Sequence, residues 1–111
     1  MTSLKITTRD APTGPVLEIT GDLDYASAPE LRDVLAALAL RPGQRLVLDL
    51  SGMTFCDSSG ITALISGHHH AHAADAQIAL AGVPADTRRI LRIVGLDQVF
   101  PLYADVDAAV A

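Results

Sequence analysis

Residues 46–50 limit the folds open to this chain more than any other segment, because they are apolar on both faces of a strand. The sequence Leu-Val-Leu-Asp-Leu has apolar side chains at both alternating sets of positions. Strands that are covered on both faces are typical of the centre of a parallel sheet. The segment therefore predicts a central parallel strand in a sheet layered with helices.

Turn residues divide the rest of the chain into short segments with strand periodicity. Residues 4–8 alternate like a half-exposed strand, and residues 16–20 follow a turn rich in proline and glycine as a second strand, which Gly21 stops. These two strands are expected to pair as an antiparallel hairpin. Residues 77–81 are predicted as a further strand, and residues 99–103 as an edge strand, where a proline is tolerated.

Four helices are predicted among these strands. Residues 27–30, Ser-Ala-Pro-Glu, have the spacing of a capping box with a proline in the first turn, and an apolar stripe follows to residue 38. The other helices are expected from Ser58 onward, over residues 84–94 with Gly95 as C-terminal cap, and over residues 106–110 behind Asp105.

The predicted element order is β-β-α-β-α-β-α-β-α. This order favours a single layered α/β domain over residues 1–111, with a mainly parallel mixed sheet and an N-terminal antiparallel hairpin. Ligands and partners gather at the carboxyl ends of the strands in such sheets. Residues 21–25 and the segment after Asp49 are rich in acidic or hydroxyl side chains and are expected at those ends.

The charge balance restricts the partners. Thirteen acidic residues against eight Lys and Arg give a net charge of −5, which disfavours direct binding of nucleic acid. The one basic cluster, residues 88–92, has the spacing of a solvated helix face. No apolar run approaches the roughly 20 residues of a membrane span, and residues 1–5 lack a signal-peptide core. With a single cysteine, we expect a cytoplasmic protein without membrane contact.

The segment Asp57-Ser58-Ser59-Gly60 holds the candidate functional residues. One interpretation is structural: Asp57 or a serine caps the helix, and the glycine eases the turn. The other is functional, because a hydroxyl at an exposed helix start is open to a kinase, and Gly60 would allow a partner to approach closely. The local pattern fits both interpretations.

This segment resembles the phosphorylation site of the bacterial anti-sigma-factor antagonists, which are small single-domain members of the STAS family. Their signature is Asp-Ser-Ser/Thr-Gly at the start of the helix after the third strand. The resemblance covers nearly the whole chain, since Gly-Asp-Leu-Asp at 21–24 matches the family's upstream loop. Residues 47–50, 94–96 and 99–101 match other parts of the family pattern in the same order.

The resemblance implies a regulatory switch. The unphosphorylated protein binds an anti-sigma factor and so releases a sigma factor for transcription, in a stress response or in sporulation. The anti-sigma factor is also a serine kinase of ATPase fold that phosphorylates Ser58, and a serine phosphatase resets the cycle. The protein is then a substrate and not an enzyme, and needs no cofactor. The residues expected to contact the partner are Asp24, Tyr25, Asp57, Ser59 and Gly60.

Some of these residues have simpler interpretations. Asp24 and Tyr25 are also typical of a solvated loop. Asp57 is expected to order its turn instead of performing acid chemistry. An alternative function is that of a STAS subunit in a transporter or lipid-trafficking complex in which Ser58 is never phosphorylated, although the intact signature favours the kinase substrate.

The histidines at positions 68–72 depart from the family pattern. His68 and His72 are helical i, i+4 partners that would need a third ligand, with Asp75 nearest, so we expect no metal site. A catalytic pair of Ser58 and His68 is excluded because ten helical residues separate them by roughly 15 Å. Cys56 beside Asp57 is expected to be a small core residue and not a nucleophile.

Overall fold

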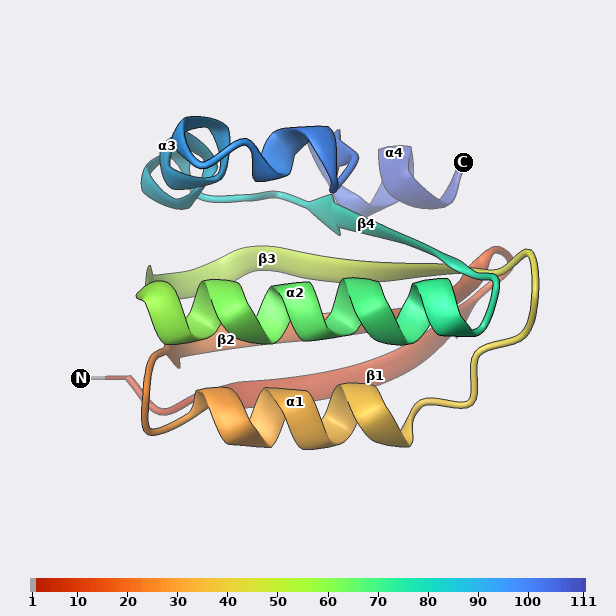
Figure 1. Cartoon of the computed structure of the whole chain (residues 1–111), viewed down its shortest axis with the longest axis horizontal. Helices are drawn as coiled ribbons and strands as arrows, with labels where there is room; N and C mark the ends of the chain where they lie inside the picture. The colour runs from red at the N-terminus through yellow and green to blue at the C-terminus, as the bar shows by residue number, and fades with distance from the viewer. Residues whose placement is uncertain (1) are drawn as a thin grey trace.

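The computed structural model describes residues 2–111, and its strands form one five-stranded sheet (Figure 1). The strand order is β1-β2-β3-β4-β5, so strands that follow one another in sequence are neighbours in space. Strand β1 is antiparallel to β2, and every other pair is parallel, which confirms the predicted mixed sheet with its N-terminal hairpin. The strands are β1 (Lys5–Ala11), β2 (Gly14–Leu23), β3 (Arg45–Cys56), β4 (Gln77–Ala81) and β5 (Leu102–Tyr103).

The helices alternate with the parallel strands, as the sequence predicts. Helices α1 and α2 lie side by side over one face of the sheet, while α3 and α4 lie toward the edge formed by β4 and β5 (Figure 1). No helix within residues 2–111 is long and apolar enough to cross a membrane. The helices are α1 (Ala28–Ala37), α2 (Ser58–Ala73), α3 (Ala85–Ile93) and α4 (Val106–Val110), with a 3-10 turn η1 at Leu96–Gln98.

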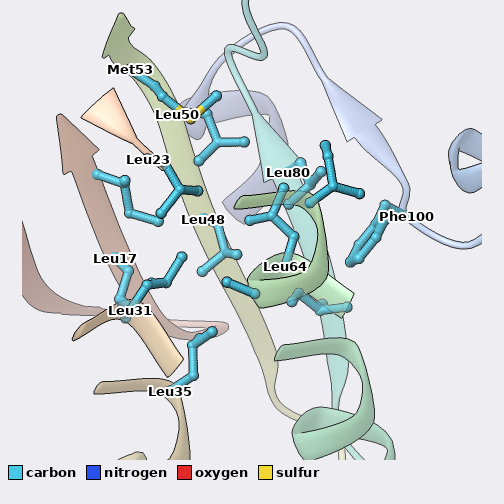
Figure 2. Close-up of a cluster of buried hydrophobic side chains, with 14 of the residues drawn as sticks. Leu17, Leu23, Leu31, Leu35, Leu48, Leu50, Met53, Leu64, Leu80 and Phe100 are labelled. Carbon is cyan, nitrogen blue, oxygen red and sulfur yellow. The ribbon is translucent and has the colours of Figure 1, made fainter. Parts of the chain in front are cut away.

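Alternation along the strands builds the core. Leu48 of β3 is fully buried in the cluster that α1 and α2 cover, together with Leu17 of β2 and Leu80 of β4 (Figure 2). Residues adjacent to these along the strands point to the opposite face, where Val47 packs with Ala109 of α4. The prediction that residues 46–50 are covered on both faces is thus confirmed.

Two strands continue beyond their predicted ends. Strand β3 runs to Cys56 instead of ending at residue 50, and Gly21 lies inside β2 instead of stopping it. Both extensions have the same cause, because Asp22 pairs with Phe55 and Leu23 with Cys56 after a shift in register. The two strands therefore satisfy each other's backbone groups in a segment whose sequence has no strand periodicity.

Two local predictions are wrong. The predicted strand 99–103 is only β5, because residues 96–98 form η1 and Phe100 turns inward to fill the core. The predicted capping box at residues 27–30 does not form either: Ser27 makes no side-chain cap to α1. Its Oγ instead lies 2.8 Å from the carbonyl oxygen of Asp22 and donates to it. Asp105 does cap α4, accepting from the backbone N–H of Ala108 at 2.8 Å.

Candidate functional site

The two candidate segments begin side by side at one end of the sheet. Strands β2 and β3 are parallel neighbours, and their last residues, Leu23 and Cys56, are partners in the register. The segments that follow, residues 24–27 and residues 57–60, therefore start at the same edge. This is the carboxyl end of the strands, where the sequence placed the site.

Asp57 joins the two segments. It caps α2, because its Oδ1 accepts from the backbone N–H of Gly60 at 3.0 Å. Its Oδ2 accepts from the backbone N–H of Tyr25 at 3.2 Å, and its own N–H donates to the carbonyl oxygen of Leu23 at 3.2 Å. The carboxylate thus fixes the start of α2 against the neighbouring loop, and the expectation that Asp57 orders its turn is confirmed.

Ser58 and Ser59 lie on different sides of the helix start. Ser58 is the first residue of α2, is exposed, and lines a groove that α2 forms with α3. Ser59 is half-buried and lines a smaller hollow of about 250 Å³ on the side of α1, together with Tyr25. The two hydroxyls of the motif therefore face different surroundings.

Gly60 has a packing role inside the domain. The residue is buried, and a Cβ there would lie 2.7 Å from Sγ of Cys56 and 2.8 Å from the carbonyl oxygen of Leu23. The absence of a side chain therefore lets α2 approach the end of β2 closely. The reason given from sequence, that Gly60 opens space for a partner beside Ser58, is wrong.

Asp24 and Tyr25 are close in sequence but differ in environment. Oδ1 of Asp24 accepts from the backbone N–H groups of Ala26 and Ser27, both at 3.1 Å, so this carboxylate shapes the turn before α1. The side chain of Tyr25 is 82% exposed. Of the two, Tyr25 offers the larger free contact surface beside the start of α2.

The groove beside Ser58 was missed by the sequence analysis. It has a volume of about 550 Å³ and runs between the first turns of α2 and the end of α3. The sequence places Ile90 and Val94 in the predicted helix over residues 84–94 and predicts no groove beside it. In the structure Ile90 and Val94 remain 39% and 58% exposed. A usable signal was the density of apolar residues over 90–94, which exceeds what one buried helix face can hold. The full set of lining residues is Cys56, Asp57, Ser58, Ile61, Thr62, Ile65, Ile90, Val94 and Leu96.

The thiol in this groove is not a nucleophile at neutral pH. Burial raises the pKa of Cys56 to about 11, and the nearby charge of Asp57 acts in the same direction. Cys56 is half-buried and packs against the core, as expected. An activated cysteine would need the opposite environment, with cationic neighbours that lower its pKa.

The histidines lie at the other end of α2. The rings of His68 and His72 are stacked with centroids 6.1 Å apart, and His68 also meets the ring of Phe100 edge-on at 5.8 Å. Nε2 of His70 lies 2.8 Å from the carbonyl oxygen of Leu38. Within residues 2–111, no three His, Cys, Asp or Glu side chains are grouped so that they could hold a metal ion.

Comparisons with known proteins agree with this architecture. A family model described as "Mlab, STAS domain" matches residues 6–103. A STAS-domain containing protein of Pseudomonas aeruginosa is 34% identical over 86 residues, which are 78% of this chain and 84% of that protein. The anti-sigma-F factor antagonist of Mycobacterium tuberculosis is 26% identical over 107 residues, 96% of this chain and 87% of the relative. The crystal structure of an anti-sigma factor antagonist from Mycobacterium paratuberculosis superposes with a TM-score of 0.83 at 28% identity, covering 95% of this chain and 89% of the other.

Proposed function

The chain belongs to the STAS domain family, and from the position of Ser58 we propose that it is an anti-sigma-factor antagonist switched off by phosphorylation of this serine. Its unphosphorylated form binds an anti-sigma factor and so releases a sigma factor. The observation that carries the proposal is an exposed hydroxyl at the first residue of α2, on the rim of an apolar groove. The names of the mycobacterial relatives support the general role.

The proposed partner is an anti-sigma factor that is also a serine kinase of ATPase fold, with a serine phosphatase as the enzyme that restores the free hydroxyl. Ser58 is accessible to a kinase without any unfolding, because it is the exposed first residue of α2 and the strand before it ends two residues earlier. Asp57 already holds the backbone in the capped form, so the hydroxyl is presented by a fixed frame.

Phosphorylation at this position leaves the fold intact. A phosphoserine adds about −1.5 to −2 charges at neutral pH. The N-terminus of a helix stabilises such a charge by about 0.3–2 kcal/mol. Ser58 is exposed, so the phosphate remains in water in the free protein.

The same phosphate disrupts a complex. A partner that fills the groove with an apolar side chain must bury the rim, where Asp57 already carries a negative charge beside Ser58. Removing a dianion from water there costs several kcal/mol unless new cations pair with it. Because each 1.4 kcal/mol is tenfold in affinity, this cost is enough for a switch.

The two serines offer a matched pair for the test. Only Ser58 lines the groove, whereas Ser59 faces the hollow beside α1. We therefore expect one phosphate, on Ser58, after incubation with the cognate kinase and ATP, as measured by intact mass and peptide mapping. Ser58→Ala abolishes labelling and still binds, Ser58→Asp folds and binds poorly, and Ser59→Ala is labelled like the wild type.

Two results would contradict the proposal. Phosphate found only on Ser59 would reject Ser58 as the acceptor. A protein phosphorylated on Ser58 that binds its anti-sigma factor as tightly as before would reject the switch. Isolation of a transporter complex as the stable partner of the unmodified protein would instead support the alternative function of a STAS subunit in a transporter or lipid-trafficking complex.

A further inference from the structure

A second pocket lies at the opposite end of the sheet from Ser58. It has a volume of about 340 Å³ and is formed where α2 ends and β3 and β4 begin. Figure 1 shows this end of the sheet on the right, far along α2 from its first residue. Ser58 and His72 are separated by 14 helical residues, or roughly 21 Å along the axis. The pocket is therefore distinct from the groove between α2 and α3.

Arg45 is held in this pocket without an acidic partner. Its Nη1 donates to the carbonyl oxygen of Ala109 at 2.7 Å, and its guanidinium lies 5.8 Å from the centroid of the Tyr103 ring. The only ion pair within residues 2–111 joins Arg9 to Glu18. None of the described residues that line the pocket is acidic, although acidic residues outnumber basic ones in the chain. A half-buried arginine that is fixed in place and unpaired is a preformed site for an anion.

Two histidines face the same space. His68 and His72 line the pocket from α2, and Gln77 of β4 contributes an amide. Burial lowers the pKa of His68, and the charges of His69 and His72 lower it further. The titratable groups that line the pocket with His68 are Arg45 from β3, Tyr103 from β5 and His72 of its own helix. Each of them is neutral or cationic near neutral pH, so a bound anion would favour protonation of His68.

We propose that this pocket binds a small organic anion, with its carboxylate or phosphate on Arg45 and the two histidines and its apolar part on Val99 and Tyr103. The volume is in the range of small-molecule sites, which begin near 300 Å³, and leaves room for more than an inorganic ion. Apolar walls with a few convergent donors are the usual form of such sites.

The test measures binding of phenyl phosphate, benzoate and inorganic phosphate to the purified chain by calorimetry, with EDTA present to remove metal bridged by the histidines. We expect saturable binding of at least one organic anion, at least about fivefold tighter than inorganic phosphate. Arg45→Met should weaken it by about tenfold or more, which corresponds to 1.4 kcal/mol. Arg41→Met is the matched control, because Arg41 is an exposed arginine outside this pocket. The affinity of this variant for the organic anion should stay within about twofold of the wild-type value.

A second measurement does not depend on the stability of the Arg45 variant. In the wild type, NMR titration of the histidine rings should show that saturating organic anion raises the pKa of His68, and that binding tightens as the pH falls. His72→Gln keeps Arg45 and should weaken binding by a few-fold.

Three outcomes would overturn the proposal. The first is no saturable binding of either organic anion up to about 10 mM. The second is equal affinity for organic and inorganic anions, which would reject the apolar subsite. The third is an affinity that Arg45→Met leaves unchanged, or a pKa of His68 that does not move when the anion binds to the wild type. Either result would locate the anion elsewhere.

Discussion

Helices α2 and α3 form the two walls of the groove beside Ser58, yet they are anchored very differently. Helix α2 spans 16 residues and α3 only nine. The side chain of Asp57 caps α2, whereas Pro84 at the start of α3 offers no side-chain cap. Helix α3 buries only Thr87 and Leu91, while α2 buries Gly60, Ile61, Ala63, Leu64, Gly67 and Ala71.

The difference separates a helix that stabilises the fold, α2, from a helix that leaves apolar side chains at the surface, α3. Ile93, the last residue of α3, and Val94, its C-cap, are 75% and 58% exposed, although burying them would stabilise the fold. Apolar side chains kept at a surface mark a contact site, and few buried contacts give a segment low local stability. The proposed phosphate acceptor thus lies on α2, the fixed wall with a side-chain cap and many buried residues, and the exposed apolar side chains lie at the end of α3, the adaptable wall.

Truncating one buried leucine on each helix tests this contrast most strongly. Leu64 of α2 and Leu91 of α3 are both fully buried. Leu64→Ala should lower the free energy of unfolding by about 3–5 kcal/mol, because the surrounding core cannot collapse. Leu91→Ala should cost about 2–3 kcal/mol, since α3 can shift to fill the space. Urea denaturation measures both, and equal losses would contradict the difference between the walls.

The two glycines of α2 allow a sharper comparison within one wall. A Cβ at Gly60 would meet the backbone of Leu23 at 2.8 Å, whereas at Gly67 its nearest atom, the methyl Cδ1 of Leu35, is 3.2 Å away. Gly60→Ala should therefore lower the unfolding free energy by about 2–3 kcal/mol, and Gly67→Ala by less than about 1 kcal/mol. Comparable values for the two variants in urea denaturation would mean that the end of β2 can move away from α2.

Removing the cap of α2 is expected to have a smaller effect. Asp57→Ala loses the bonds to the N–H groups of Gly60 and Tyr25, so we expect a cost of about 1–2 kcal/mol. Asp86 in the first turn of α3 is the matched control, since it acts there only through the helix dipole. Asp86→Ala should cost about 0.3–0.5 kcal/mol in thermal unfolding. A larger loss for Asp86 than for Asp57 would invert the comparison.

The sequence predicts what local periodicity determines. Residues 46–50 and the stripe of α1 were recognised because burial on a strand or helix face repeats at a fixed spacing. The extension of β3 to Cys56 could not be recognised in this way, because it depends on pairing with residues 22 and 23 of another strand. The same holds for the start of α1, where Asp24 accepts from the N–H of Ser27 and Ser27 donates to the carbonyl oxygen of Asp22, an arrangement that depends on the geometry of the turn.

The candidate site was predicted only in part, because some of its features depend on local sequence and others on contacts between distant segments. The capping role of Asp57 follows from its position before a helix, and the structure confirms it. The groove does not follow from any single segment. Which apolar residues of 90–94 stay uncovered depends on how far α3 lies from α2, and that distance is set by the fold as a whole.

Polar substitutions on α3 should affect binding and leave stability almost unchanged. Val94→Ser lies in the groove and should weaken the complex with the anti-sigma factor by about tenfold, while unfolding changes by less than about 0.5 kcal/mol. Ile93→Ser is the control, since Ile93 is the exposed last residue of α3, next to Val94, but does not line the groove. If Ile93→Ser weakens the complex as much as Val94→Ser, the partner contacts the whole helix and not the groove.

The smallest effect concerns the reactivity of two thiols in the groove, Cys56 at the end of β3 just before α2 and a cysteine introduced at the end of α3, with no change in fold. Cys56 has a pKa of about 11 against an ordinary value of 9.0, so at pH 8 its thiolate fraction is about a hundredfold lower. A cysteine placed at the exposed C-cap position 94 after α3, by Val94→Cys in a Cys56→Ala chain, should react as an ordinary thiol. Reaction with a chromogenic disulfide at pH 8 should therefore be about a hundredfold slower for the wild type, and urea should remove the difference. Asp57→Asn should speed Cys56 only modestly, because burial is the larger cause of the shift. Equal rates for the two folded proteins would mean that the start of α2 opens as readily as α3, and the contrast between a fixed and an adaptable wall would fail.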